Sequence, residues 1–278
     1  MTENNMNDNI HMMEQGSELW HQYKCGKISA SHISDVMAKG KGTTRKNYLA
    51  RMVAERMSNT PIETFSSGAM LWGIETEPLA RKAYSFKKSV EVLEVGFIDH
   101  PEIEGYGVSP DGLVGETGMV EFKCPNTATH IETLLAAKAR KAVKQIVGDK
   151  YYKQMQGQMD TAERDYVDYV SFDPRMPIEL RMVIVRVVRD DIFINQINEE
   201  VLLFIEDMIN MVAELDEMTD KQIPAETAPI IVEIPALELE ELIHDEEVIA
   251  PEAMEPQEEG LQEVPDLEAP PEPMLNLF

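Results

Sequence analysis

The chain has 278 residues, of which 43% are hydrophobic, so it is long enough for one sizeable hydrophobic core or two small ones. Two cysteines are too few for a disulfide scaffold, and neither a signal peptide nor an apolar run of membrane-spanning length is present. We therefore expect a soluble intracellular protein, and its net charge of −26 disfavours nucleic-acid binding unless the charge is unevenly distributed.

The N-terminal part of the chain is predicted to be helical after a polar, disordered segment at residues 1–13. Apolar residues between positions 17 and 38 are typical of short helices that separate at Gly26. Residues 45–57 have the pattern of a basic amphipathic helix, and residues 67–86 have that of a second amphipathic helix.

A hairpin is predicted in the middle of the chain, after a strand at residues 90–99. Its turn contains two glycines, and its second strand covers residues 119–123. Because side chains alternate along a strand, Glu121 and Lys123 point to the same face. Asp111, at the mouth of the hairpin, can reach that face, so two carboxylates and an ammonium are expected to converge.

This trio of side chains is costly to place next to a buried strand unless it binds something. A divalent metal ion such as Mg²⁺ prefers carboxylate ligands, polarises a phosphoryl oxygen and acidifies water, and a neighbouring lysine can orient that water. The pattern therefore favours metal-assisted phosphodiester cleavage. An acidic residue followed by Glu-x-Lys also occurs in solvated hairpins, and spacing alone leaves both interpretations open.

The chain after the hairpin is predicted to alternate between helices and strands. Helices are expected at residues 130–147 and 151–164, strands at residues 166–172 and 180–188, and a closing helix at residues 190–214. Together with the hairpin, these elements predict an α/β fold with a central mixed sheet that is flanked by helices.

The negative charge is concentrated in the C-terminal tail. Residues 216–278 contain 19 acidic residues, a single lysine and nine of the 16 prolines, a composition typical of disorder. Two basic clusters lie in the rest of the chain, at residues 20–60, which include Lys24 and Arg51, and at residues 136–156. Such clusters can attract a phosphate backbone, although solvated helical faces have the same composition.

Six blocks of sequence, in the same order, match one family. They are Leu19-Trp20-His21 with Gly26 to Ser31, Trp72-Gly73 with Glu77, Ser109 to Leu113, Glu121 to Pro125, Gln154 with Gln156, and Phe172 to Met176. Over residues 14–215 the chain resembles the lambda-exonuclease-like (YqaJ-type) viral recombinases of the PD-(D/E)XK nuclease superfamily.

The resemblance implies a restriction-endonuclease-like core and a Mg²⁺-dependent 5′→3′ exonuclease. Such an enzyme degrades one strand from the ends of double-stranded DNA and leaves 3′ single strands for annealing recombination. The resemblance also implies two Mg²⁺ ions, with Mn²⁺ as a substitute, a homotrimeric ring, a single-strand annealing protein as partner, and the cytoplasm of a bacterial host.

The same resemblance assigns roles to matched positions. By this resemblance, the metal ligands are Asp111, Glu121, Glu77 and the backbone carbonyl of Phe122. Lys123 orients the attacking water, and Gln156 assists near the scissile phosphate. Lys24, Ser31 and Ser109 match the positions that bind the 5′-phosphate. Met70 is either a wedge that separates the terminal base pair or a core residue. The family has an arginine where this chain has Lys24, and an ammonium cannot form a bidentate fork, which predicts a weaker preference for 5′-phosphorylated ends.

Alternatives to this function remain open on the sequence alone. One is an endonuclease or an exonuclease of other polarity, and another is a non-catalytic module that binds DNA ends or a partner. At the C-terminus, Leu275, Leu277 and Phe278 resemble the clamp-binding peptide of bacterial replication proteins. They predict docking on a host sliding clamp, with a merely solubilising tail as the alternative.

Overall fold

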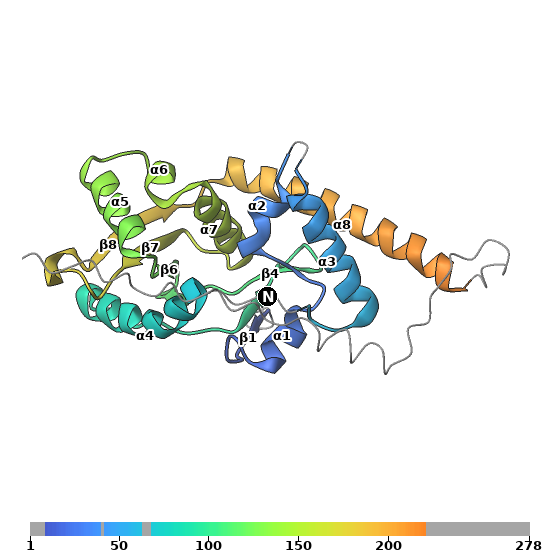
Figure 1. The fold of residues 1–278 in the computed structure, drawn as a ribbon, viewed down its shortest axis with the longest axis horizontal. Helices are drawn as coiled ribbons and strands as arrows, with labels where there is room; N and C mark the ends of the chain where they lie inside the picture. The colour runs from blue at the N-terminus through green and yellow to red at the C-terminus, as the bar shows by residue number, and fades with distance from the viewer. Residues whose placement is uncertain (1–8, 40–41, 63–67, 221–278) are drawn as a thin grey trace, which may run out of the picture. The chain divides into compact units, whose positions relative to one another are not determined.

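Two four-stranded β-sheets form the framework of the structure, and helices lie against them (Figure 1). The structure is a computed structural model that describes residues 9–39, 42–62 and 68–220. The segment predicted to be disordered at residues 1–13 is described only from residue 9, and there Ile10–His11 form a paired strand, contrary to the prediction. The predicted clamp-binding tip lies outside the described residues. Among the described residues, no helix is both long and apolar enough to cross a membrane.

The first sheet contains the predicted hairpin. Its strands, in spatial order, are β5 (Gly112–Val114), β6 (Gly118–Lys123), β7 (Tyr166–Phe172) and β8 (Met182–Val188). β6 pairs antiparallel with β5 and parallel with β7, and β7 pairs antiparallel with β8, so the sheet is mixed. Gly115 has a φ of 58°, a conformation that favours glycine and permits the tight turn between β5 and β6.

The second sheet joins the N-terminal segment to the chain that precedes the hairpin. Its strands, in spatial order, are β1 (Ile10–His11), β3 (Phe97–Asp99), β4 (Tyr106–Val108) and β2 (Ile28–Ser29). β4 leads directly into Ser109, so this sheet positions the start of the hairpin. The strand predicted at residues 90–99 is shorter than expected, because only its end pairs in the sheet, while Leu93 forms an isolated bridge with Leu113.

The helices follow the predicted order, with two corrections. They are α1 (Glu18–Lys24), α2 (Ile33–Val36), α3 (Thr44–Ser58), α4 (Gly68–Lys88), α5 (Thr127–Lys138), α6 (Val143–Val147), α7 (Asp149–Thr161) and α8 (Asp191–Asp220), with 3-10 turns η1 (Ala30–His32) and η2 (Ile178–Leu180). The helix predicted at residues 130–147 is divided into α5 and α6, and Arg140, with a left-handed φ of 52°, lies in the break. α8 also continues past residue 214, where the closing helix is predicted to end, so residues 216–220 of the segment predicted to be disordered are helical.

β6 is buried on both of its faces. Met119 packs in a larger core that includes Met155 of α7, whereas Val120 and Phe122 pack in a smaller core with Tyr84 of α4. Figure 1 shows α4 on one side of these strands and α7 on the other. The face that we predicted to be polar is therefore covered by a helix. The expected mixed α/β architecture is confirmed.

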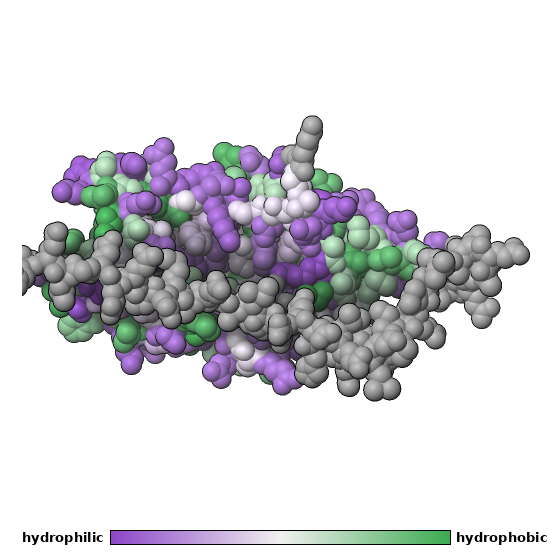
Figure 2. Space-filling view, in the orientation of Figure 1, coloured by the Kyte–Doolittle hydropathy of each residue, from purple (hydrophilic) through white to green (hydrophobic). Residues whose placement is uncertain are grey.

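Outside the two cores, exposed apolar side chains gather on two helices. These side chains are Leu71, Ile74, Leu79 and Phe86 on α4, and Ile192, Leu202, Leu203 and Ile209 on α8. Figure 2 shows apolar patches between hydrophilic areas on the face that it presents. Apolar patches on a surface are a common feature of sites where proteins associate.

Candidate active site

The three side chains that the hairpin was predicted to bring together do converge. The backbone N–H of Phe122 donates to Oδ2 of Asp111 at 2.6 Å, which fixes this carboxylate beside the C-terminal end of β6. Nζ of Lys123 donates to Oε1 of Glu121 at 2.5 Å, and Glu121 is only 1% exposed. The alternation of side chains along β6 is what places Glu121 and Lys123 on one face.

Helix α7 supplies two further donors to the buried carboxylate of Glu121. Nε2 of Gln154 donates to Oε1 at 2.7 Å, and Nε2 of Gln158 donates to Oε2 at 2.8 Å. Residues four apart lie on the same face of a helix, so one turn of α7 holds both oxygens of Glu121 in place. Sequence reasoning did not identify Gln158, although its spacing from Gln154 was the available signal.

Gln156, which the family resemblance places near the scissile phosphate, points away from this site. Its side chain is fully buried, its Nε2 donates to the carbonyl of Val188 at 2.9 Å, and its Oε1 accepts from the N–H of Asp190 at 2.9 Å. Each helical residue turns by about 100°, so a residue two positions from Gln154 and from Gln158 lies on the opposite face of α7. Gln156 therefore ties α7 to the end of β8.

Glu77 lies at the edge of the site, on α4, and is held by an arginine. Arg81, one turn further along α4, donates to Oε1 of Glu77 at 2.6 Å and approaches the carbonyl of Asp111 at 3.4 Å. Arg81 also pairs with Glu94 at 2.6 Å. Sequence reasoning missed Arg81, because a Glu–Arg pair four residues apart is also an ordinary feature of solvated helices.

The charges of the site strongly perturb one another. Burial, followed by the negative charge of Glu121, raises the pKa of Asp111 well above its usual value. Burial also raises the pKa of Glu77, although Arg81 opposes this effect. For Lys123, burial acts to lower the pKa, but the carboxylates of Glu121 and Asp111 outweigh it and raise the pKa above the usual value. The site therefore contains an excess of negative charge and a firmly protonated lysine.

This donor set fits a divalent cation. Within residues 9–39, 42–62 and 68–220, no three His, Cys, Asp or Glu side chains form a metal site by themselves. The chain instead offers the carboxylates of Asp111 and Glu121 and the backbone carbonyl of Phe122, and Mg²⁺ commonly completes such a partial set with water. Burial and, after it, repulsion by the Glu121 carboxylate raise the pKa of Asp111, and a bound cation would relieve this repulsion.

The residues predicted to bind a 5′-phosphate lie around Trp20 and η1. Nζ of Lys24 lies 3.5 Å from the ring centroid of Trp20, and the indole N–H of Trp20 donates to Oγ of Ser109 at 3.1 Å. Oγ of Ser31 lies 3.3 Å from Oγ of Ser29. Burial, aided by a nearby arginine, lowers the pKa of Lys24 to about 8. Lys24 and Ser109 therefore flank one indole, and Ser109 is two residues from the catalytic candidate Asp111.

The remaining predicted residues are more peripheral. Met70 lies in the first turn of α4 and is 50% exposed, so it does not belong to either core. Arg45, which belongs to the first basic cluster, pairs with Asp207 of α8 at 2.7 Å. In the second basic cluster, Lys144 and Lys153 both pair with Asp149, at 2.7 Å and 2.6 Å. Two of the six basic residues of the second cluster are thus engaged locally.

Comparisons with known proteins extend this description. Residues 19–165, more than half of the chain, match the family described as the YqaJ-like viral recombinase domain. Two crystal structures of LHK-Exo, an alkaline exonuclease from Laribacter hongkongensis, are similar to this chain, and one of them is a complex with dAMP. Each is 40% identical with a TM-score of 0.67, and the match covers 74% of this chain and 100% of theirs.

A phage-related exonuclease from Haemophilus somnus 129PT is 18% identical with a TM-score of 0.54, over 68% of this chain and 96% of its own, which is a likeness of fold alone. A comparison with curated proteins found no match.

Proposed function

The chain belongs to the YqaJ-like viral recombinase domain family and is a nuclease of the lambda-exonuclease type, and from this premise we propose a more specific activity. The activity is Mg²⁺-dependent removal of nucleotides from the 5′-ended strand of a DNA duplex, with Mn²⁺ as a substitute. The product is a duplex with a 3′ single-stranded overhang.

The convergence of Asp111, Glu121 and Lys123 on a buried strand is the observation that carries this proposal. When Mg²⁺ is bound there, it supplies polarisation of a phosphoryl oxygen and acidification of water. Asp111, Glu121 and the Phe122 carbonyl would hold one ion, and Glu77 is the carboxylate available to a second. Lys123 stays protonated, so it positions the attacking water as a donor and offsets the negative charge that develops on the phosphate.

The 5′ polarity is supported by the pocket around Trp20. A terminal phosphate bound by Lys24 and Ser109 would lie next to the segment that carries Asp111, with the first phosphodiester bond nearby. LHK-Exo binds dAMP, a mononucleotide of the kind that stepwise degradation of a strand releases. We therefore propose that this pocket receives the end of the strand that is degraded.

We further propose that the overhang passes to a single-strand annealing protein in the cytoplasm of a bacterial host. We also propose that the chain assembles into a homotrimeric ring that encloses the duplex. The exposed apolar side chains of α4 and α8 support an association of copies. Light scattering after gel filtration measures the number of chains in the assembly, and a purely monomeric protein would contradict the ring.

One assay tests the activity and its alternatives. Linear duplex DNA labelled at either the 5′ or the 3′ end, and covalently closed circular duplex, are incubated with the full chain and Mg²⁺. The proposal expects mononucleotide release from the 5′ label of linear DNA alone. Cleavage of the circle would indicate an endonuclease, release from the 3′ label would indicate the other polarity, and intact DNA throughout would indicate a binding module.

A further inference from the structure

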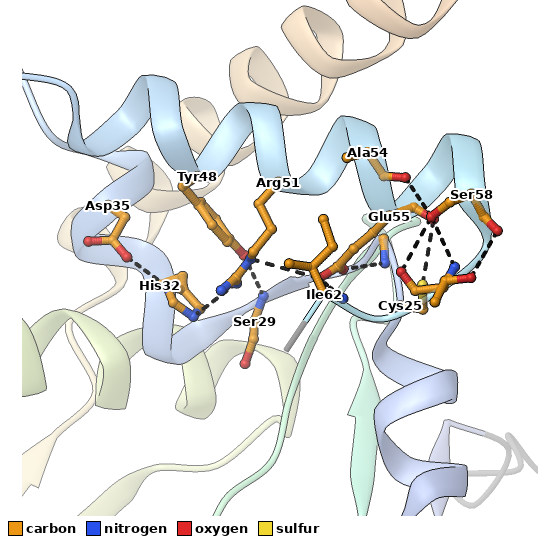
Figure 3. A network of polar contacts seen from close by, with 12 residues as sticks. Cys25, Ser29, His32, Asp35, Tyr48, Arg51, Ala54, Glu55, Ser58 and Ile62 are labelled. Atoms are coloured by element: carbon orange, nitrogen blue, oxygen red, sulfur yellow. Dashed lines mark hydrogen bonds and ion pairs between the residues drawn. The ribbon is translucent and has the colours of Figure 1, made fainter. Parts of the chain in front are cut away.

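A second basic side chain, Arg51 of α3, lies in the region of the proposed phosphate pocket. Figure 3 shows its side chain extending from α3 toward His32 and Ser29, beside Tyr48. Its guanidinium carbon lies 5.0 Å from the ring centroid of Tyr48, and the hydroxyl of Tyr48 accepts from the backbone N–H of Ser29 at 3.4 Å. Oγ of Ser29 lies 3.3 Å from Oγ of Ser31, which belongs to the proposed phosphate pocket, and the charge of Arg51 is close enough to Lys24 to help lower its pKa.

The charge of Arg51 is only weakly compensated by the groups around it. The carboxylate of Glu55 is 3.8 Å from Nε of Arg51 and is already engaged by the backbone N–H groups of Gly26, at 2.9 Å, and Ile62, at 3.3 Å. Among the described residues, Nε of Arg51 is a buried donor without a hydrogen-bond partner. An unsatisfied buried donor is rare in folded proteins and commonly marks the place of an absent ligand or water.

His32 does not neutralise Arg51 either. Nη2 of Arg51 lies 3.2 Å from Nε2 of His32, whose Nδ1 lies 2.6 Å from the carboxylate of Asp35. Burial, together with the charges of Arg51 and Lys24, lowers the pKa of His32 even though Asp35 acts to raise it. The neutral imidazole thus accepts from Arg51 and donates to Asp35, which orients the guanidinium without removing its charge.

Arg51 also borders an open hollow that is large enough for a phosphate group. The hollow has a volume of about 400 Å³ and is lined by His32, Asp35, Thr43, Thr44, Asn47, Tyr48 and Arg51. Its lining combines one guanidinium with several hydroxyl and amide groups, and Asp35, its one carboxylate, is bonded to His32. An anion is the class of ligand that this arrangement favours.

We infer that Arg51 is a second cationic ligand of the terminal 5′-phosphate, and that it works together with Lys24 in a two-cation pocket. This inference rests on the proposed function. A lysine alone offers a point charge, whereas a guanidinium offers parallel donors that match two phosphate oxygens. The pair therefore supplies the oriented donors that Lys24 by itself lacks.

The test compares two arginines of the same helix. Arg51→Ala is measured against Arg45→Ala, because Arg45 pairs with Asp207 of α8 and serves as a matched loss of one positive charge. The readout is the rate of digestion of 5′-phosphorylated duplex divided by that of 5′-hydroxyl duplex, with Mg²⁺. We expect Arg51→Ala to lower this ratio by about tenfold or more, the effect of one lost charge-assisted hydrogen bond, and Arg45→Ala to leave it unchanged.

A binding measurement keeps the inference separate from the proposed function. Fluorescence anisotropy of 5′-phosphorylated and 5′-hydroxyl duplexes, in EDTA, reports preference for the phosphate even if the full chain cleaves no DNA. Arg51→Ala should lose this preference, and Arg51→Lys, which retains the charge, should keep part of it. The inference is overturned if Arg51→Ala keeps the wild-type preference, if Arg51→Lys is as defective as Arg51→Ala, or if Arg45→Ala is equally defective.

Discussion

The glutamines of α7 allow a sharp test of how the buried carboxylate is held. Gln158→Leu removes the donor to Oε2 of Glu121, at 2.8 Å, and also removes the side-chain oxygen of Gln158, which is buried without a partner among the described residues. Loss of the charge-assisted hydrogen bond lowers the free energy of unfolding by about 1.5–3 kcal/mol, and removal of the unsatisfied oxygen raises it by about 1–3 kcal/mol. We therefore expect a small net change in the free energy of unfolding.

The Mg²⁺ concentration that Gln158→Leu needs for digestion should change much more than its free energy of unfolding. Hydrogen bonds to a metal-binding carboxylate fix its orientation, and their loss typically weakens metal affinity or activity by about 10–100-fold. The assay is the rate of digestion of linear duplex across a Mg²⁺ titration, combined with urea unfolding of the same samples. We expect the Mg²⁺ midpoint to rise by at least tenfold while the unfolding midpoint moves little.

Gln156→Leu is the matched control, because it changes a buried glutamine on the opposite face of the same helix. It removes two bonds to the backbone around Val188 and Asp190, and each lost bond costs about 0.5–1.5 kcal/mol. We expect lower stability and an unchanged Mg²⁺ midpoint. A shift of the Mg²⁺ midpoint in Gln156→Leu that equals the shift in Gln158→Leu would refute this assignment of the two glutamines.

Two further predictions concern the lysines. Lys123→Ala should reduce digestion by about 10²–10⁴-fold while binding of DNA ends in EDTA persists, and near wild-type turnover would show that Lys123 does not act on the chemical step. Burial and Arg51 lower the pKa of Lys24 to about 8, so its charge is present below that pH and is lost as the pH rises through it. The ratio of the digestion rates on 5′-phosphorylated and 5′-hydroxyl ends should therefore fall between pH 7 and pH 9 in the wild type. In Lys24→Arg the ratio should stay level over the same range. Parallel pH profiles of the two proteins would argue against contact between Lys24 and the phosphate.

The parts of the site that depend on local geometry were predictable from the sequence. Strand alternation was sufficient to place Glu121 and Lys123 on one face, and the turn glycines located the hairpin that brings Asp111 close. The break between α5 and α6 was not predictable, because Arg140 carries no sequence signal for a left-handed backbone.

The parts that depend on packing between elements were missed. The resemblance favoured Gln156, whereas the packing of α7 on β6 decides which of its faces meets Glu121. The same holds for Arg81 and Arg51, which look like ordinary basic residues on helices until the neighbouring elements are in place.

The position of β6 between two hydrophobic cores has a consequence for local opening of the molecule. An amide group on a strand covered on both faces exchanges its hydrogen only in large-scale opening events, because no small fluctuation exposes it. Separating β6 from either neighbour would disturb the core of Met119 or the core of Val120. We therefore expect the backbone amide of Glu121 to be among the slowest to exchange in the fold, and on heating the site should persist until the domain unfolds as a whole.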